Sequence, residues 1–274
     1  MKVVDWDDAF SNSTYIDRAE EYPARWAALA AEFRAAAQAE LDIPYATAAR
    51  NRLDLFHPKT GTAQGLVVFV HGGYWLKFDK SVWSHLAAGA VAKGWAVALP
   101  SYTLAPAARI SHMTTEIGQA ITTAASRIEG PILLAGHSAG GHLVSRMICT
   151  DSPLPAGIQS RVGHVLSISG LHDLRPLLAT QMNCSLGLSE SEALAESPAL
   201  ATPIAGPSVS AWVGALERPE FLRQAGVLRE AWAAKGARIS MTILPESHHF
   251  DIIEGLSSPE TALCQALLNG QMTV

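Results

Sequence analysis

The stretch PILLAGHSAGGHL (131–143) changes character around a single serine, Ser138. It begins as an apolar run, passes through glycine and alanine, and continues as an amphipathic segment. This order predicts a strand that turns sharply into a helix. Residues 136–140, GHSAG, match the pattern G-x-S-x-G, in which such a turn holds the serine in a strained backbone conformation. Small neighbours keep the crowded turn free of collisions. We therefore expect Ser138 to present its hydroxyl at the end of a strand.

Comparable apolar runs recur along the chain and alternate with segments of helical periodicity. Several runs are apolar almost throughout, which is typical of strands that helices cover on both faces of a mostly parallel sheet. The predicted strands are RLDLF (from about residue 50), GLVVFV (65–70), WAVALP (95–100), PILLAG (131–136), HVLSIS (164–169), SVSAWV (208–213) and ISMTIL (239–244). The predicted helices between them are 81–93, 114–128, 141–150, 221–235 and 259–268. The alternation predicts an open α/β sheet flanked by helices.

Length and composition predict a single domain, 1–274. The chain has 274 residues, of which 49% are hydrophobic and 16% charged, enough to bury one large core. Two regions interrupt the alternation. An N-terminal segment, 1–45, contains an alanine-rich stretch (24–40) with an apolar stripe, and this helix either caps a pocket or packs on the body of the domain. The other region, 171–207, carries several prolines and is predicted to be an irregular insertion with short helices that shapes the substrate site.

The net charge of −5 comes with basic residues that are scattered along the chain. The sequence therefore lacks the basic patch with which proteins bind nucleic acid or an anionic membrane surface. The first residues, MKVVDWDDAF, carry acids where a signal peptide needs an apolar run, and no run reaches the length of a membrane span. We expect a cytoplasmic protein that acts on a small molecule. The sequence does not decide whether the chain forms a homodimer. Three distant cysteines outside any C-x-x-C spacing argue against a disulfide framework or a zinc site.

A serine hydroxyl reacts as a nucleophile when a histidine takes its proton and a carboxylate orients that histidine. In chains with this type of turn, the acid and then the histidine follow the serine in sequence. Two adjacent histidines, His248 and His249, follow the last predicted strand. The acid is predicted at Glu217, in the loop after a strand, with Asp173 after the preceding strand as its rival. The remaining alternatives are Glu220, Asp251 or the absence of an orienting acid.

The stretch HGGYW (71–75) follows the strand 65–70 and supplies the second requirement of acyl transfer. The reaction passes through a tetrahedral oxyanion, and each donor aimed at it contributes on the order of a hundredfold in rate. Glycine lets bare backbone N–H groups approach the substrate. We predict an oxyanion hole formed by the N–H groups of Gly72, Gly73 and Ala139.

Five stretches together resemble a known enzyme family. They are HGGYW (71–75), SYTLAP (101–106), GHSAGGHL (136–143), VGALERPEF (213–221) and HHFDII (248–253). With them, the chain from about residue 67 to residue 256 resembles the kynurenine formamidase (arylformamidase) branch of the hormone-sensitive-lipase-like α/β-hydrolases. The resemblance implies an α/β-hydrolase fold.

The resemblance also implies a role for each matching residue. Ser138 is the implied nucleophile, His249 the base, and the two glycines with the alanine after Ser138 form the oxyanion hole. The family usually has aspartate where this chain has Glu217, so the site must accommodate a longer side chain. Broader lipase-like relatives place the histidine two positions before a phenylalanine, which would select His248 instead.

The implied activity is hydrolysis of N-formylkynurenine to kynurenine and formate through a formyl-enzyme, without a metal or an organic cofactor. Tyr74, Trp75 and Tyr102 either provide aromatic walls for the aryl substrate or belong to the core. The main alternative is a carboxylesterase or thioesterase that acts on small acyl esters.

Two further readings are weaker. One is a binding module on the same fold without catalytic activity, which would not explain the presence of Ser138 and His249. A metal hydrolase would draw on a different set of side chains, and the chain lacks the H-E-x-x-H spacing of such enzymes. That set is His137, His142, His172 and Asp173.

Overall fold

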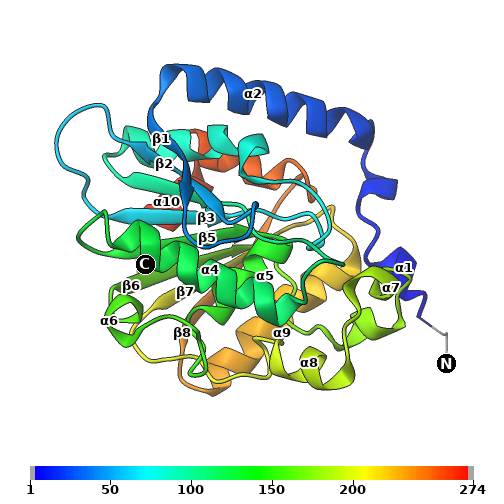
Figure 1. The fold of residues 1–274 in the computed structure, drawn as a ribbon. Coiled ribbons are helices and arrows are strands. Elements are labelled where there is room, and N and C mark those ends of the chain that lie inside the picture. Colours follow the sequence, from blue (N-terminus) through cyan, green and yellow to red (C-terminus); the bar gives the residue numbers. More distant parts are fainter. Residues whose placement is uncertain (1–3, 271–274) are drawn as a thin grey trace.

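The central sheet joins strands from most of the chain (Figure 1). Its strands are β1 (Gln38–Pro44), β2 (Arg52–His57), β3 (Leu66–Val70), β4 (Ala96–Pro100), β5 (Ile132–His137), β6 (Val162–Ile168), β7 (Ser208–Gly214) and β8 (Arg238–Leu244). The computed structural model describes residues 4–270, in which these eight strands are ordered β1-β2-β4-β3-β5-β6-β7-β8. β2 pairs antiparallel with both β1 and β4, and every pair from β4 to β8 is parallel. The predicted mostly parallel α/β sheet is confirmed.

Helices cover both faces of this sheet (Figure 1). The α-helices are α1 (Trp6–Ala9), α2 (Tyr22–Ala36), α3 (Ala88–Ala92), α4 (Ile110–Ala125), α5 (Ala139–Arg146), α6 (Ala156–Gln159), α7 (Asn183–Leu186), α8 (Glu190–Ala195), α9 (Pro219–Ala234) and α10 (Ala262–Asn269). The 3-10 helices are η1 (Ser13–Tyr15), η2 (Ala19–Glu21), η3 (Lys80–Val82), η4 (Ser84–Ala87), η5 (Arg175–Ala179) and η6 (Ile252–Ser257). α4, α5 and α9 pack on one face, whereas α2, α3 and α10 contribute to the apolar cluster on the other.

The inner strands are largely apolar because both of their faces are covered. Every residue of β3, β4, β5 and β7 is buried. In β3, Val68 and Val70 face the cluster with α4 and α5, whereas Val67 and Phe69 face the opposite cluster. This alternation follows from the two-residue repeat of a strand. Each fully buried side chain of this size stabilises the fold by about 1.5–3 kcal/mol.

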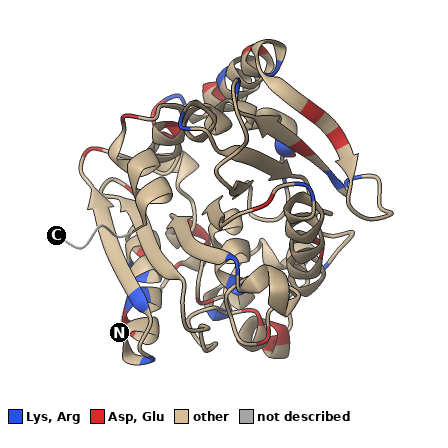
Figure 2. Cartoon of the chain, turned by 90° about the vertical axis from the view of Figure 1, so that its left-hand side faces the viewer, with Lys and Arg blue, Asp and Glu red and all other residues tan. Residues whose placement is uncertain are grey.

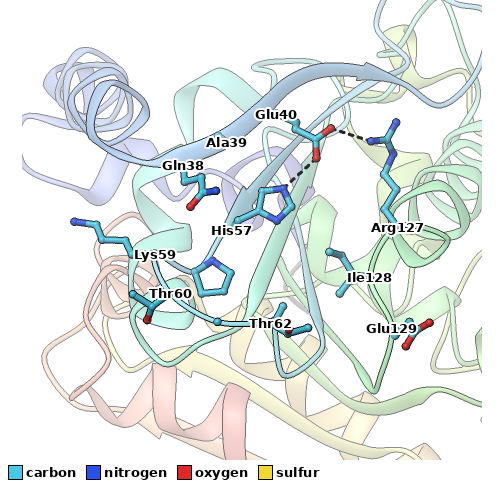
Figure 3. Close-up of a pocket in the computed structure, with 13 residues that line it drawn as sticks. Gln38, Ala39, Glu40, His57, Lys59, Thr60, Thr62, Arg127, Ile128 and Glu129 are labelled. Atoms are coloured by element: carbon cyan, nitrogen blue, oxygen red, sulfur yellow. Dashed lines mark hydrogen bonds and ion pairs between the residues drawn. The ribbon is translucent and has the colours of Figure 1, made fainter.

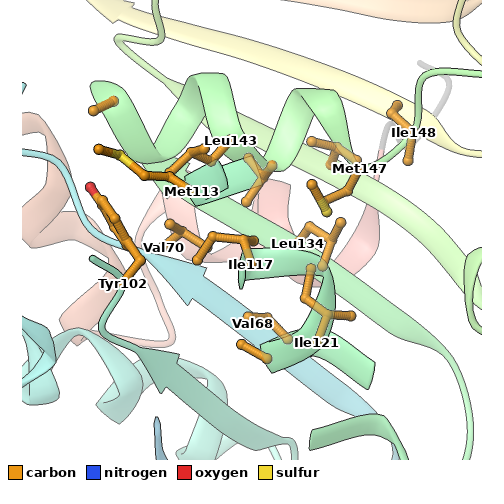
Figure 4. Close-up of a cluster of buried hydrophobic side chains, with 14 of the residues drawn as sticks. Val68, Val70, Tyr102, Met113, Ile117, Ile121, Leu134, Leu143, Met147 and Ile148 are labelled. Atoms are coloured by element: carbon orange, nitrogen blue, oxygen red, sulfur yellow. The ribbon is translucent and has the colours of Figure 1, made fainter. Parts of the chain in front are cut away.

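The core beneath the predicted serine turn lies between β3, β5 and the helices α4 and α5. Figure 4 shows Val70 and Leu134 of the strands opposite Ile117 of α4 and Leu143 of α5. All four side chains are fully buried. The helix after the turn is therefore fixed by apolar packing, which holds the beginning of α5 at the end of β5.

Two parts of the secondary structure differ from the prediction. β1 was not predicted because it is an edge strand with one buried residue, Ile43, and so carries no apolar alternation. The predicted helix 81–93 is instead made of η3, η4 and the short α3. All four residues of η4 are buried, so this segment is enclosed on several sides and has no single amphipathic stripe.

The predicted domain 1–274 and its N-terminal segment 1–45 include residues 1–3 and 271–274, which lie outside the described residues. Within the described range, no helix combines the length and apolarity required to cross a bilayer. Basic and acidic residues are interspersed in the view of Figure 2.

Candidate active site

Ser138 lies at the junction of β5 and α5, as the motif predicts. Its backbone has φ 55° and ψ −117°, a combination that is strained for any residue with a side chain. Two backbone hydrogen bonds hold it there, one from its N–H to the carbonyl of Ile168 (2.8 Å) and one from the N–H of His142 to its carbonyl (3.2 Å). Its Oγ has no hydrogen-bond partner in residues 4–270 and faces a pocket. The fold therefore strains the turn and leaves the hydroxyl free to react.

The glycines of the turn are required by close backbone approach. A Cβ on Gly136 would lie 2.2 Å from the carbonyl oxygen of Gly140, and one on Gly140 would lie 1.9 Å from that of Val70. Both obstacles are backbone atoms, which cannot rotate away. β5, β3 and the start of α5 can meet this closely only without side chains at these two positions.

Gly140→Ala should therefore destabilise the protein by about 3 kcal/mol or more, since the new methyl group forces a backbone shift in a packed core. The matched control is Gly226→Ala in α9, where a Cβ meets nothing within 4 Å. Alanine is favoured over glycine in a helix, so this variant should gain about 0.5–1 kcal/mol. Urea denaturation measures both changes. Equal stability of the two variants would contradict the steric explanation.

Glu217 and His249 form a buried pair. Glu217 follows β7 and His249 follows β8, and Nδ1 of the histidine lies 2.6 Å from Oε2 of the glutamate. The other oxygen, Oε1, accepts hydrogen bonds from Ser169 Oγ (2.5 Å) and from the backbone N–H of Gly214 (2.8 Å). Because the carboxylate can only accept, Nδ1 carries the hydrogen and Nε2 is the free basic nitrogen. The longer glutamate side chain is thus accommodated and fixed at both oxygens.

The rival acid lies elsewhere. Asp173 receives hydrogen bonds from Arg175, with its Oδ1 2.8 Å from Nε, and its Oδ2 lies 3.8 Å from Arg223. These guanidinium groups and the associated hydrogen bonds hold the pKa of Asp173 below its usual value, although burial opposes them. Glu220 is likewise bound by Arg223. Neither carboxylate contacts a histidine after β8 in the described residues.

The rival histidine turns away from the serine. Nε2 of His248 lies 3.1 Å from the hydroxyl of Tyr22 in α2, and Nδ1 accepts a hydrogen bond from the backbone N–H of Phe250 (3.1 Å). Its backbone N–H donates to the remaining candidate acid, Asp251. His249, by contrast, lines the same pocket as Ser138. The structure thus brings together one histidine, one acid and the serine.

His137 occupies the first x position of G-x-S-x-G and has a contact that was not predicted from the sequence. Its Nε2 donates to the backbone carbonyl of His249 (2.9 Å), and the two rings lie 4.6 Å apart. Burial holds the pKa of His137 well below its ordinary value, so the ring is neutral. A neutral ring fixes the His249 loop without placing a second positive charge beside it. The motif position was visible in the sequence, but this long-range contact was not.

The predicted oxyanion segment lies beside the serine. Gly73, Tyr74 and Trp75 all have positive φ (110°, 54° and 59°), an unusual run that includes two bulky residues. The backbone N–H groups of all three predicted donors, Gly72, Gly73 and Ala139, donate no hydrogen bond within residues 4–270. Gly72 lies directly beside the serine, since a Cβ built on Gly72 would lie 3.0 Å from the Cβ of Ser138. Free donors therefore stand next to the free hydroxyl.

The pocket above these groups has a volume of about 440 Å³. Tyr74 is the one residue of its aromatic lining that was predicted to contact substrate. The full aromatic lining comprises Trp26, Tyr74, Phe78, Trp83 and Phe250. The N-terminal segment contributes residues from Ser13 to Trp26, so it both packs on η3 and η4 and forms part of the pocket. The insertion 171–207 contributes no residue to the described lining. The prediction that the insertion 171–207 shapes the substrate site is therefore wrong for this pocket.

Two predicted substrate-binding residues are not in the pocket. Trp75 and Tyr102 are fully buried. Tyr102 stacks on the ring of His71 at 4.5 Å and donates its hydroxyl hydrogen to the His71 carbonyl (3.0 Å), whereas Trp75 packs edge-on against His142. They support the oxyanion segment from behind, and the prediction that they contact substrate is corrected.

A larger cleft of about 870 Å³ lies at the β1–β2 edge, away from these groups (Figure 3). There Glu40 is bound to His57 (3.1 Å) and Arg127 (2.9 Å), and the lining includes neither Ser138 nor His249. Within residues 4–270, no three His, Cys, Asp or Glu side chains gather as metal ligands do. The serine pocket is therefore the best candidate site.

Comparisons with known proteins agree with this geometry. Residues 67–264 match the model of the alpha/beta hydrolase family. Kynurenine formamidase of Danio rerio is 30% identical, and that of Salmo salar 31% identical, each match covering 86% of this chain and 83% of the relative.

Solved structures give the same answer for the fold. A Silicibacter sp. TM1040 structure, described as that of a proposed thioesterase, is 50% identical with a TM-score of 0.92 over 97% of this chain and 99% of that one. An esterase from Pyrobaculum calidifontis, 16% identical with a TM-score of 0.72 over 90% of each chain, shares the fold. The protein is thus a hydrolase, and it belongs to the alpha/beta hydrolase family as a kynurenine formamidase-like member.

Proposed function

We propose that this protein hydrolyses N-formylkynurenine to kynurenine and formate. The observation that carries the proposal is the buried Glu217–His249 pair, whose histidine lines the same aromatic pocket as the free hydroxyl of Ser138. Two relatives named kynurenine formamidase support the choice of substrate. An aryl formamide suits this pocket because its flat ring can pack against Trp26 and Phe250, whose own rings lie 5.3 Å apart.

In the proposed reaction, Oγ of Ser138 attacks the formyl carbon while Nε2 of His249 takes the hydroxyl proton. Glu217 holds the Nδ1 hydrogen and stabilises the imidazolium that forms. The carbonyl oxygen becomes an oxyanion and receives hydrogen bonds from the backbone N–H groups of Gly72, Gly73 and Ala139.

The oxyanion then collapses and the C–N bond breaks. His249 gives its proton to the leaving arylamine nitrogen, which leaves a formyl ester on Ser138. A water molecule attacks this ester, His249 takes one water proton, and the serine leaves with that proton. The released formic acid loses its remaining acidic proton to solvent and becomes formate. The cycle ends with the groups in their starting states, so it requires no co-reactant besides water.

A short-chain ester or thioester is the second candidate substrate. The observation that favours it is the 50% identical Silicibacter structure described as a proposed thioesterase. The same hydroxyl, imidazole and oxyanion donors serve either reaction, because both pass through a tetrahedral oxyanion.

Substrate preference tests the proposal. We expect kcat/KM for N-formylkynurenine to exceed those for p-nitrophenyl acetate, p-nitrophenyl butyrate and S-phenyl thioacetate, although these alternatives have better leaving groups. Discrimination is a ratio of kcat/KM values, so all four must be measured under the same conditions. A higher value for an ester or the thioester would replace formamidase by that activity.

A further inference from the structure

The serine pocket carries two charged side chains that the proposed chemistry does not use. They are Glu20 and Lys77. Glu20 lies in η2, in the N-terminal segment, and Lys77 lies just after the oxyanion segment. The backbone N–H of Lys77 donates to the carbonyl of Gly73 (3.0 Å), so the lysine is attached to the loop beside the serine. Two segments far apart in sequence thus place opposite charges on one cavity.

Both charges lack a protein partner. Neither side chain forms an ion pair or a hydrogen bond with another residue of the described range 4–270. Their neighbours differ: Arg18 lies 3.5 Å from Glu21, and Arg25 lies 2.7 Å from Glu254. These two neighbouring charges are paired, whereas Glu20 and Lys77 are exposed side chains that line the pocket and are available to a ligand.

The rest of the cavity is suited to an apolar ring. Trp26, Phe78, Trp83 and Phe250 line it together with the serine and the histidine. A ligand that satisfies all of these features has an aryl group, a reactive acyl group, and a tail with one positive and one negative charge. A simple neutral ester would use the ring and the serine and leave Glu20 and Lys77 to water.

We propose that Lys77 binds the α-carboxylate and Glu20 the α-ammonium of a substrate with a zwitterionic amino-acid tail. The inference rests on the proposed function and adds recognition of the charged end of the substrate. Because this end does not change during the reaction, the two residues bind ground state and transition state alike. Their loss raises KM and changes kcat little.

The experiment compares a charged and a neutral formamide. For Lys77→Met, we expect KM for N-formylkynurenine to rise about tenfold, the effect of losing a charge-assisted contact, and KM for formanilide to rise less than about twofold. Glu20→Gln should show the same pattern. The matched controls remove the same charges outside this pocket: Lys59→Met in the β1–β2 cleft and Glu21→Gln beside Arg18. Both controls should leave both KM values unchanged. Equal effects of Lys77→Met on the two formamides would overturn the inference.

A second measurement does not need formamide turnover. Kynurenine and 2′-aminoacetophenone, which lacks the amino-acid tail, are tested as competitive inhibitors of p-nitrophenyl acetate hydrolysis. We expect kynurenine to bind more tightly to the wild type, and Lys77→Met to remove that advantage. If N-formylkynurenine is not hydrolysed but this advantage is seen, the proposed function is wrong and the charge recognition stands. If kynurenine has no advantage over 2′-aminoacetophenone, the charge recognition is wrong.

Discussion

Ser138→Ala should lower kcat by about 10⁴-fold or more for every acyl substrate, because it removes the atom that forms the covalent intermediate. The fold should survive. Oγ of Ser138 has no hydrogen-bond partner within residues 4–270, so its removal leaves no protein group unsatisfied. Steady-state hydrolysis of p-nitrophenyl acetate and N-formylkynurenine measures the loss, and a thermal melt checks the fold.

Covalent labelling separates loss of the nucleophile from loss of binding. A fluorophosphonate probe should label the wild type and fail to label Ser138→Ala, since it reacts with an activated serine. The matched control is Ser145→Ala in the same helix α5, whose Oγ donates to the carbonyl of Gly141 and does not line the pocket. This control should still be labelled. Labelling of Ser138→Ala would mean that another residue is the nucleophile.

The fold was predictable wherever local sequence decides local structure. The stretch 131–143 encodes a buried strand, a turn with no room for side chains and a packed helix, and all three are present. β1 was not predicted because an edge strand that buries a single residue has no apolar pattern to recognise. Its place depends on pairing with β2, which is a long-range property that the segment does not itself encode.

The candidate site shows the same division. Chain order pointed to Glu217 and to two adjacent histidines. Long-range contacts distinguish the two histidines, because His249 contacts Glu217 whereas His248 contacts Tyr22, 226 positions away. The aromatic lining of the pocket was not predicted either, because Trp26 and Phe250 come into contact only through the packing of α2 on η4. Likewise, the buried positions of Trp75 and Tyr102 follow from packing behind the oxyanion segment, which aromatic character alone does not reveal.

Glu217→Gln should lower kcat by about 10⁴-fold, and the surrounding donors explain why an almost isosteric change is so damaging. Oε1 of Glu217 receives the Ser169 hydroxyl and the Gly214 N–H. In the variant, the amide oxygen must occupy that position to satisfy both donors, so the amide NH₂ points at Nδ1 of His249. Nδ1 then becomes an acceptor, the hydrogen moves to Nε2, and the nitrogen that should take the serine proton is already protonated.

The comparison with Asp173→Asn distinguishes this tautomer effect from a general loss of buried charge. Asp173 is also buried, but its partners are Arg175 and Arg223, and it does not contact the histidine. Its variant should lose some stability and keep kcat within about threefold, since exposed guanidinium partners contribute roughly 0–1 kcal/mol. Glu217→Gln should instead keep KM and fluorescence-detected kynurenine binding while kcat collapses. If Asp173→Asn were the more damaging change to kcat, the orienting carboxylate would have to be assigned to Asp173, and the contact between Glu217 and His249 would be structural.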